Sequence, residues 1–72
     1  MKFIEIDYDK AHSIVNSNKN LFWDGWDIIE YRYNPDAIYS NDARFINGKW
    51  AFVKTYKPNA NGWKVPDKYG NR

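Results

Sequence analysis

Two stretches of the chain alternate between apolar and polar residues in the way that strands do. Residues 3–6 place Ile4 and Ile6 on one side, which predicts a short strand with both isoleucines buried. Residues 26–34 alternate over a longer run and predict a second strand. Pro35 should end that strand, because proline has no N–H to donate to a neighbouring strand.

A short helix is predicted between these strands. Apolar side chains recur there at helical spacing, at Ala11, Ile14 and Val15. Asp7 or Asp9 can accept hydrogen bonds from the free N–H groups at a helix start. Serines and asparagines make the helix weak, and Asn18 or Asn20 should end it after two or three turns.

The dipeptide Asn47-Gly48 gives the strongest local signal, a tight hairpin turn between two alternating segments. A two-residue turn fixes the register, and one face of the hairpin then carries Phe45, Trp50 and Phe52. Tyr39 joins this face opposite Tyr56 if the pairing continues without a bulge. We expect this aromatic face to pack inward, because exposing it would create an adhesive sheet.

The periodic pattern fades in the last quarter of the chain. Trp63 and Val65 alternate enough for a brief edge strand, and the residues beyond Pro66 predict a flexible basic tail. We therefore expect one domain over residues 1–58 and a tail over residues 59–72.

These elements together predict an α+β fold. One short helix packs on a three- to four-stranded antiparallel sheet, in the order β-α-β-β-β along the chain. A small SH3-like partial barrel is the alternative, because short and strongly twisted strands can curl.

Composition limits the kinds of site that 72 residues can hold. The chain has no cysteine, so it forms no disulfide and no thiolate metal site, and one histidine (His12) makes a zinc site improbable. We expect no cofactor. Aromatic residues make up 19% of the chain, and each ring buries about 150–250 Å² in a small core. The sequence has neither a long apolar run nor a secretory signal, so we expect no membrane contact and a cytoplasmic location.

The polar residues predict no catalytic site. His12 and Ser13 are neighbours on the predicted helix, where adjacent positions do not face each other. Asp24, Asp27 and Glu30 are spaced by three, but on a strand Asp27 and Glu30 fall on opposite faces. The four glycines form no phosphate-binding motif. We expect a protein that is not an enzyme and takes no small-molecule substrate.

Charge is divided unevenly along the chain. Residues 1–42 carry four basic and eight acidic groups, whereas residues 43–72 carry seven basic groups and one acidic group. Two interpretations remain open. The halves attract each other within the fold, or each half meets a partner of opposite charge.

The second half interleaves cations with aromatic rings. A nucleic-acid surface needs this combination, because cations neutralise phosphates and rings stack on bases. The residues predicted to bind nucleic acid or an acidic partner are Arg44, Lys49, Lys54, Lys57, Trp63, Lys64, Lys68, Tyr69 and Arg72.

A second candidate surface precedes the strand at residues 26–34. Gly25 interrupts an aromatic run, so Phe22 and Trp23 should lie in the loop that leads into the strand. Protein interfaces draw on tryptophan and tyrosine anchors, and an acidic aromatic loop suits a basic protein surface. The residues predicted to bind a protein are Phe22, Trp23, Asp24, Trp26 and Asp27.

In its general manner the chain resembles small bacteriophage-encoded proteins that bind host machinery such as RNA polymerase. The shared features are small size, no cysteine, abundant asparagine and tyrosine, split charge and no catalytic constellation. The resemblance assigns no role to any residue. It implies a cytoplasmic regulator that works by occupying a surface.

We therefore expect a non-enzymatic module, monomeric when free, that docks on a protein of the transcription or nucleic-acid machinery and modulates or inhibits it. The alternative is direct binding of DNA or RNA by the basic aromatic second half.

Overall fold

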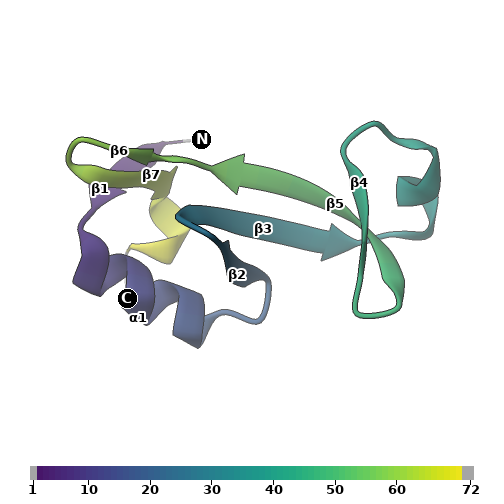
Figure 1. Ribbon diagram of the computed structural model, residues 1–72, viewed down its shortest axis with the longest axis horizontal. Helices are drawn as coiled ribbons and strands as arrows, with labels where there is room; N and C mark the ends of the chain where they lie inside the picture. Colours follow the sequence, from purple (N-terminus) through teal and green to yellow (C-terminus); the bar gives the residue numbers. More distant parts are fainter. Residues whose placement is uncertain (1, 71–72) are drawn as a thin grey trace.

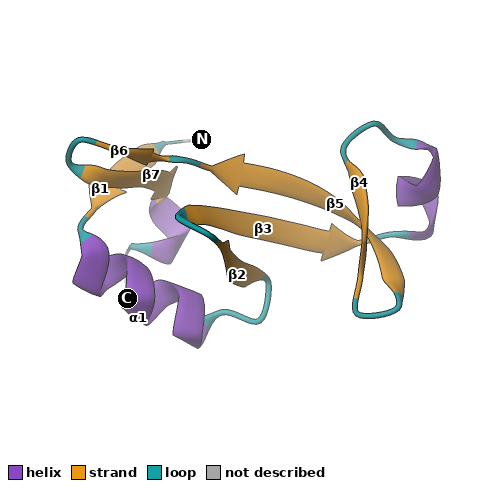
Figure 2. Ribbon diagram, viewed as in Figure 1, coloured by secondary structure: helices purple, strands orange, loops and turns teal. Residues whose placement is uncertain are grey.

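The computed structural model of the chain describes residues 2–70. Over these residues it contains one α-helix, two short 3₁₀-helices and two antiparallel sheets, so the predicted α+β class is confirmed (Figure 2). The strands form two sheets, whereas we expected one. The first sheet has the order β1-β7-β6 and the second the order β2-β3-β5-β4.

The helix forms where the sequence places it. α1 spans Tyr8–Ser17 after β1 (Phe3–Ile6), and the Asp7 carboxylate caps it by accepting from the Lys10 N–H at 2.8 Å. The helix ends at Asn18, whose side chain donates to the Ile14 carbonyl oxygen at 2.7 Å. Its predicted apolar stripe is buried, as expected: Ala11, Ile14 and Val15.

The four-stranded sheet contains two hairpins. β2 (Leu21–Asp24) pairs with β3 (Asp27–Tyr33), and β4 (Ala43–Ile46) pairs with β5 (Lys49–Tyr56). The chain joins the hairpins through η1 (Pro35–Tyr39), and β3 pairs with β5 at the centre of the sheet. The expectation that Phe22 and Trp23 lie in a loop is wrong. Both belong to β2, because Gly25 with a φ of 63° turns the chain back onto its own strand.

The turn at Asn47-Gly48 is confirmed. Both residues have positive φ, 52° and 81°, and the predicted register places Phe45 opposite Trp50. Tyr39 does not join this ladder, because it lies in η1 and Ile28 is the partner of Tyr56.

The predicted tail belongs to the fold. β6 (Pro58–Asn59) and β7 (Gly62–Pro66) form a hairpin, and β7 lies between β1 and β6. η2 (Asp67–Tyr69) follows directly. Trp63 is only 4% exposed, so the boundary that we expected after residue 58 is not a boundary of the folded unit.

The core lies at one end of the molecule. One cluster of buried side chains joins α1, the three-stranded sheet and the near ends of β2 and β3: Ile6, Ala11, Ile14, Val15, Leu21, Ile28, Trp63, Val65 and Tyr69. We call the part built around this cluster the body (residues 2–30 and 54–70). The other part is the arm (residues 31–53), where β3 and β5 run out together to η1 and β4, on the right of Figure 1.

The arm has almost no core of its own. The only buried residues in its described sequence are two alanines, Ala37 and Ala51. The expectation that the aromatic face of the hairpin packs inward is therefore wrong for Phe45 and Trp50, which are exposed, whereas Phe52 and Tyr56 are half-buried and Tyr56 packs against the core. The arm extends past the end of the body, away from α1 and the three-stranded sheet, and only the short η1 packs against its strands (Figure 1).

Candidate binding surfaces

Two rings on the arm form the most exposed aromatic pair of the hairpin. Phe45 of β4 and Trp50 of β5 are directly opposite each other, with ring centroids 5.5 Å apart and 63% and 42% of their surfaces exposed. Large rings open to water in a small protein commonly mark an interaction surface.

The arm exposes further large apolar side chains besides this pair. In η1, Tyr39 is 86% exposed and Ile38 is also exposed. Tyr33 is exposed on the opposite face of the sheet from Trp50, because its partner in the register is Ala51. The Lys49 ammonium lies 5.3 Å from the centroid of the Tyr33 ring. The arm therefore presents rings on both of its faces.

A hollow of about 530 Å³ opens where the arm meets the body. Phe52, Tyr56 and the cations Arg32 and Lys54 line it, on the same sheet face as Trp50. The body contributes Phe3 from β1. The hollow therefore combines rings with three cations, Arg32, Lys54 and Lys68, and two carboxylates, Glu30 and Asp42.

Glu30 also lines this hollow, and its carboxylate is held by a network of hydrogen bonds. It accepts hydrogen bonds from the hydroxyls of Tyr56, at 2.7 Å, and of Tyr69, and the Lys68 ammonium lies 3.2 Å away. Burial raises the pKa of Glu30, but the bonds from Tyr69, Tyr56 and Lys68 outweigh burial and leave the pKa below its usual value. Burial, and then the bond to Glu30, raise the pKa of both tyrosines. This network ties η2 to the sheet and is fully occupied by its own partners.

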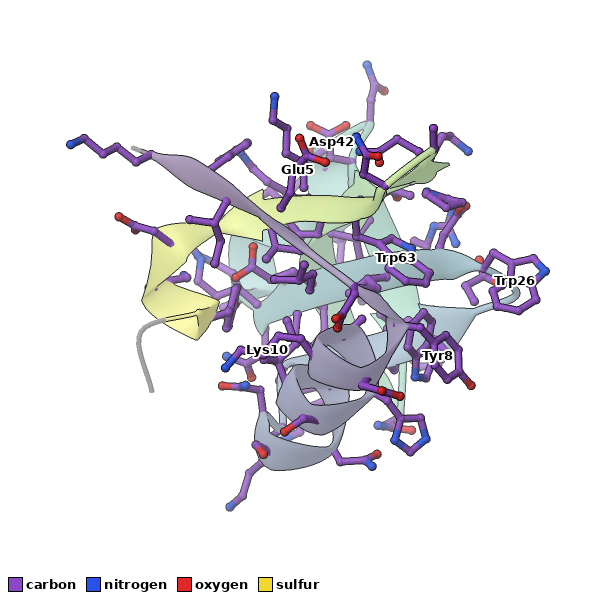
Figure 3. The ribbon with its side chains drawn as sticks, turned by 90° about the vertical axis from the view of Figure 1, so that its left-hand side faces the viewer. Glu5, Tyr8, Lys10, Trp26, Asp42 and Trp63 are labelled. Atoms are coloured by element: carbon purple, nitrogen blue, oxygen red, sulfur yellow. The ribbon has the colours of Figure 1, made fainter. Side chains whose placement is uncertain are left out.

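A second surface lies on the body. Tyr8 at the start of α1 packs near Trp23 and Trp26, with ring centroids 6.5 Å and 6.4 Å from its own. With His12 and Gly25 these rings line a shallow pocket of about 390 Å³. Figure 3 shows Tyr8 and Trp26 projecting on the same side of the body.

The residues predicted to bind a protein fall into two groups. Trp26 is 66% exposed at the hairpin turn, as an accessible contact residue should be. Trp23 is half-buried and packs on the core. The ring centroids of Phe22 and Tyr31 lie 5.6 Å apart. The two carboxylates form ion pairs within the chain, Asp24 with Arg44 at 3.9 Å and Asp27 with Lys57 at 3.4 Å.

Most of the predicted basic surface does not come together, although Lys54 and Lys68 both line the hollow. Trp63 and Tyr69 are core residues. Lys57 and Lys68 pair with body carboxylates, and Lys49 covers Tyr33 on the arm.

The remaining members of that set are dispersed. Lys64 is exposed opposite Glu5 in the three-stranded sheet, and Lys54 lines the hollow. Arg44 is exposed on the arm, and Arg72 lies outside the described residues.

The acidic residues do not form a metal site either. Asp24, Asp27 and Glu30 pair with three different cations, and no group of three potential ligands converges within residues 2–70. The imidazole Nδ1 of His12 lies within hydrogen-bond distance, 3.2 Å, of the side-chain Nδ2 of Asn16. Over the same residues no helix has the length and apolar character needed to cross a membrane.

Sequence reasoning missed most of the exposed aromatic residues. Phe45, Trp50 and Tyr39 were assigned to the core because their alternation is that of a buried sheet face. Tyr8 was not singled out. Its position in the sequence was the available signal. Tyr8 directly follows the capping Asp7, so it lies in the first turn of the helix, before the buried positions begin at Ala11.

Comparisons of the chain with family models, with curated proteins and with solved structures gave no match.

Proposed function

We propose that this chain is a non-enzymatic regulator that docks on a partner protein through the arm. The observation that carries the proposal is the exposed pair of Phe45 and Trp50 on a part of the molecule that has no core. Aromatic residues supply most of the binding energy at protein interfaces when a partner buries them. The rings on both faces of the arm suit insertion into a groove of the partner.

A protein partner is favoured over a nucleic acid by the arrangement of charge. The predicted basic residues are spread over both parts of the molecule, and several already contact carboxylates or a ring of the same chain. A nucleic-acid surface needs cations in a row that follows the phosphates. The proposed class of partner, a protein of the transcription or nucleic-acid machinery, rests on the likeness to small phage proteins alone.

The test is affinity capture from lysate with three forms of the tagged protein: the natural chain, the double variant Phe45→Ser/Trp50→Ser, and Phe3→Ser. Phe3 separates the arm from the hollow, because it is an exposed ring of the body that lines the hollow and does not belong to the arm. We expect the natural chain and Phe3→Ser to capture the same protein after nuclease treatment. The double variant should bind it about a hundredfold more weakly, as expected for the loss of two anchor residues. Undiminished capture by the double variant would refute docking through the arm.

A second candidate function is binding of single-stranded nucleic acid in the hollow. It is supported by Arg32 and Lys54, which lie on the same sheet face as Trp50 and Phe52. Titration of a fluorescent oligonucleotide at increasing salt tests it. Nucleic-acid binding should give a log–log slope of roughly −0.7 per phosphate neutralised, and capture of the partner should then require intact nucleic acid.

A further inference from the structure

We infer that the hollow between the arm and the body receives an acidic side chain, aspartate or glutamate, of the partner protein. The inference deepens the proposed function and rests on it, because it assigns a chemical feature to the partner segment that covers the arm. The groups that would hold the carboxylate are Arg32 of β3 and Lys54 of β5, which both line the hollow.

Arg32 and Lys54 lie on the same face of the sheet. In the register of β3 and β5, Arg32 is opposite Phe52 and Lys54 is opposite Glu30. The two cations are therefore diagonal neighbours on adjacent strands, a separation that long side chains can span. Two like charges so placed repel each other, and a carboxylate bound between them would remove that repulsion. The guanidinium group of arginine can also donate two parallel hydrogen bonds to one carboxylate.

The carboxylate nearest to these cations in the register is bound to other groups. Glu30 is directly opposite Lys54 and two positions from Arg32 on the same strand. Its oxygens instead accept hydrogen bonds from two tyrosine hydroxyls, and its ion pair is with Lys68. Neither Arg32 nor Lys54 forms an ion pair with a carboxylate of residues 2–70. Both cations are exposed, so a ligand can reach them.

The remaining charges of the hollow favour a single acidic group as the ligand. Lys68 offsets Glu30, and Asp42 is a further carboxylate of the lining. The Asp42 carbonyl oxygen accepts from the Val53 N–H of β5, so Asp42 lies two strands away from Arg32. Arg32 and Lys54 together match one carboxylate. A nucleic acid would bring a row of phosphates past Asp42 and would need a longer row of cations.

Rings connect the two cations to the exposed pair of the arm. Phe52 lies between Trp50 and Lys54 on one face of β5, and the exposed Phe3 of β1 lines the hollow from the body. A partner segment that buries Trp50 would therefore continue over Phe52 to the cations. Trp50 and Lys54 are separated by about 13 Å along the strand, which an extended partner segment covers in about four residues.

The experiment titrates the isolated protein with the capped peptide Glu-Gly-Ser-Gly-Phe-Gly-Ser-Gly-Glu and follows the backbone amide signals of Phe52 and Lys54 by NMR. The peptide has a glutamate on each side of the phenylalanine, at the spacing just given, so it can bind in either chain direction. One control ligand has glutamine in place of both glutamates, and the other is an oligothymidylate.

At physiological ionic strength we expect the acidic peptide to bind about tenfold more tightly than either control, because only its carboxylates accept charge-assisted hydrogen bonds from both cations. Equal binding of the acidic and glutamine peptides would overturn the inference. So would the absence of binding by the acidic peptide, or tighter binding of the oligothymidylate.

Variants locate the site. Arg32→Gln and Lys54→Gln each remove one exposed cation, and each should weaken binding of the acidic peptide about fivefold while leaving that of the glutamine peptide unchanged. Lys64→Gln is the control, because Lys64 is an exposed lysine of the three-stranded sheet and lies outside the lining of the hollow. An equal loss in Lys64→Gln would show that net charge alone attracts the peptide and would overturn the inference.

The peptide assay does not use the partner protein. Failure of this inference is therefore distinguishable from failure of docking through the arm, which the capture experiment with Phe45→Ser/Trp50→Ser measures.

Discussion

The body and the arm are both built from antiparallel hairpins, yet they use aromatic residues in opposite ways. In the body, Trp63 and Tyr69 are buried against α1 and the three-stranded sheet. In the arm, Phe45 and Trp50 lie on paired strands, as Trp63 does, but they face water. The difference arises from what lies across from each sheet face, since α1 and the three-stranded sheet enclose the rings of the body, whereas only the short η1 packs against the strands of the arm and leaves Phe45 and Trp50 exposed.

The comparison separates the residues that hold the fold from those that are free to bind. A buried ring in the body stabilises the domain through the apolar area that it removes from water. An exposed ring in the arm contributes little to folding, so its contact energy is available to a partner. Substitutions in the body should therefore lower stability, and substitutions in the arm should lower binding.

The largest expected effect comes from Gly62→Ala in the body. A Cβ at this position would lie 2.0 Å from the carbonyl oxygen of Ile6, and Gly62 has a φ of 130°. Steric overlap with the backbone of β1 and a strained φ together should cost about 3 kcal/mol or more and unfold much of the protein. Thermal unfolding followed by circular dichroism measures this loss.

The matched control is Gly48→Ala in the arm. Gly48 also has positive φ, but nothing lies within 4 Å of the added Cβ. The cost should be about 1 kcal/mol. Equal losses at the two glycines would contradict the view that β1 and β7 pack closely and the arm loosely.

Val65→Ala should have the second largest effect. Val65 is fully buried in β7, and removing two methyl groups there should cost about 2 kcal/mol in urea unfolding. If the variant were as stable as the natural chain, the C-terminal segment would not belong to the core.

A smaller effect is expected at Glu30, where the arm joins the body. Glu30→Gln should cost about 1 kcal/mol at neutral pH, because it removes charge-assisted hydrogen bonds. The pKa of Glu30 is lowered from 4.5, so its stabilising contribution is complete above that pH and is lost as the pH falls through the lower folded value.

The pH dependence provides the check. The stability difference between the natural chain and Glu30→Gln should shrink as the pH falls from 5 toward 3. A difference that stays constant over this range would show that the carboxylate charge does not contribute.

The smallest effect on stability is expected for Phe45→Ser. The ring is largely exposed, so its loss should change the free energy of unfolding by about 0.5 kcal/mol or less. Chemical denaturation measures this change. A loss comparable to that of Val65→Ala would mean that the arm has a core after all.

Local signals in the sequence were sufficient for single elements. The cap at Asp7, the apolar stripe of α1 and the Asn47-Gly48 turn were all predicted, because each depends on residues close together in the chain. Whether a sheet face is covered depends on residues that are far away in the sequence, so local patterns do not predict it. The alternation around Phe45 and Trp50 is the same whether or not a second layer exists.

The errors at the C-terminus have the same origin. The alternation of Trp63 and Val65 predicted a brief edge strand, but β7 is the central strand of its sheet, paired with β1 on one side and β6 on the other. Strand propensity is a local property, so it cannot predict that β1 and β7 pair with each other. Of the candidate sites, the exposed Trp26 was anticipated, whereas the pocket beside it depends on how α1 packs near the β2–β3 turn.

The pairing of β1 with β7 also determines when this protein can fold. Ile4 faces Val65 across that ladder, so a contact that completes the core joins the two ends of the described chain. Closing so long a loop lowers the entropy of the chain before the burial of apolar side chains can compensate, and this slows folding. During synthesis, the residues before β7 would emerge without the strand that pairs with β1, so the rings of the body would be open to water until β7 emerged, whereas those of the arm stay exposed even in the folded protein.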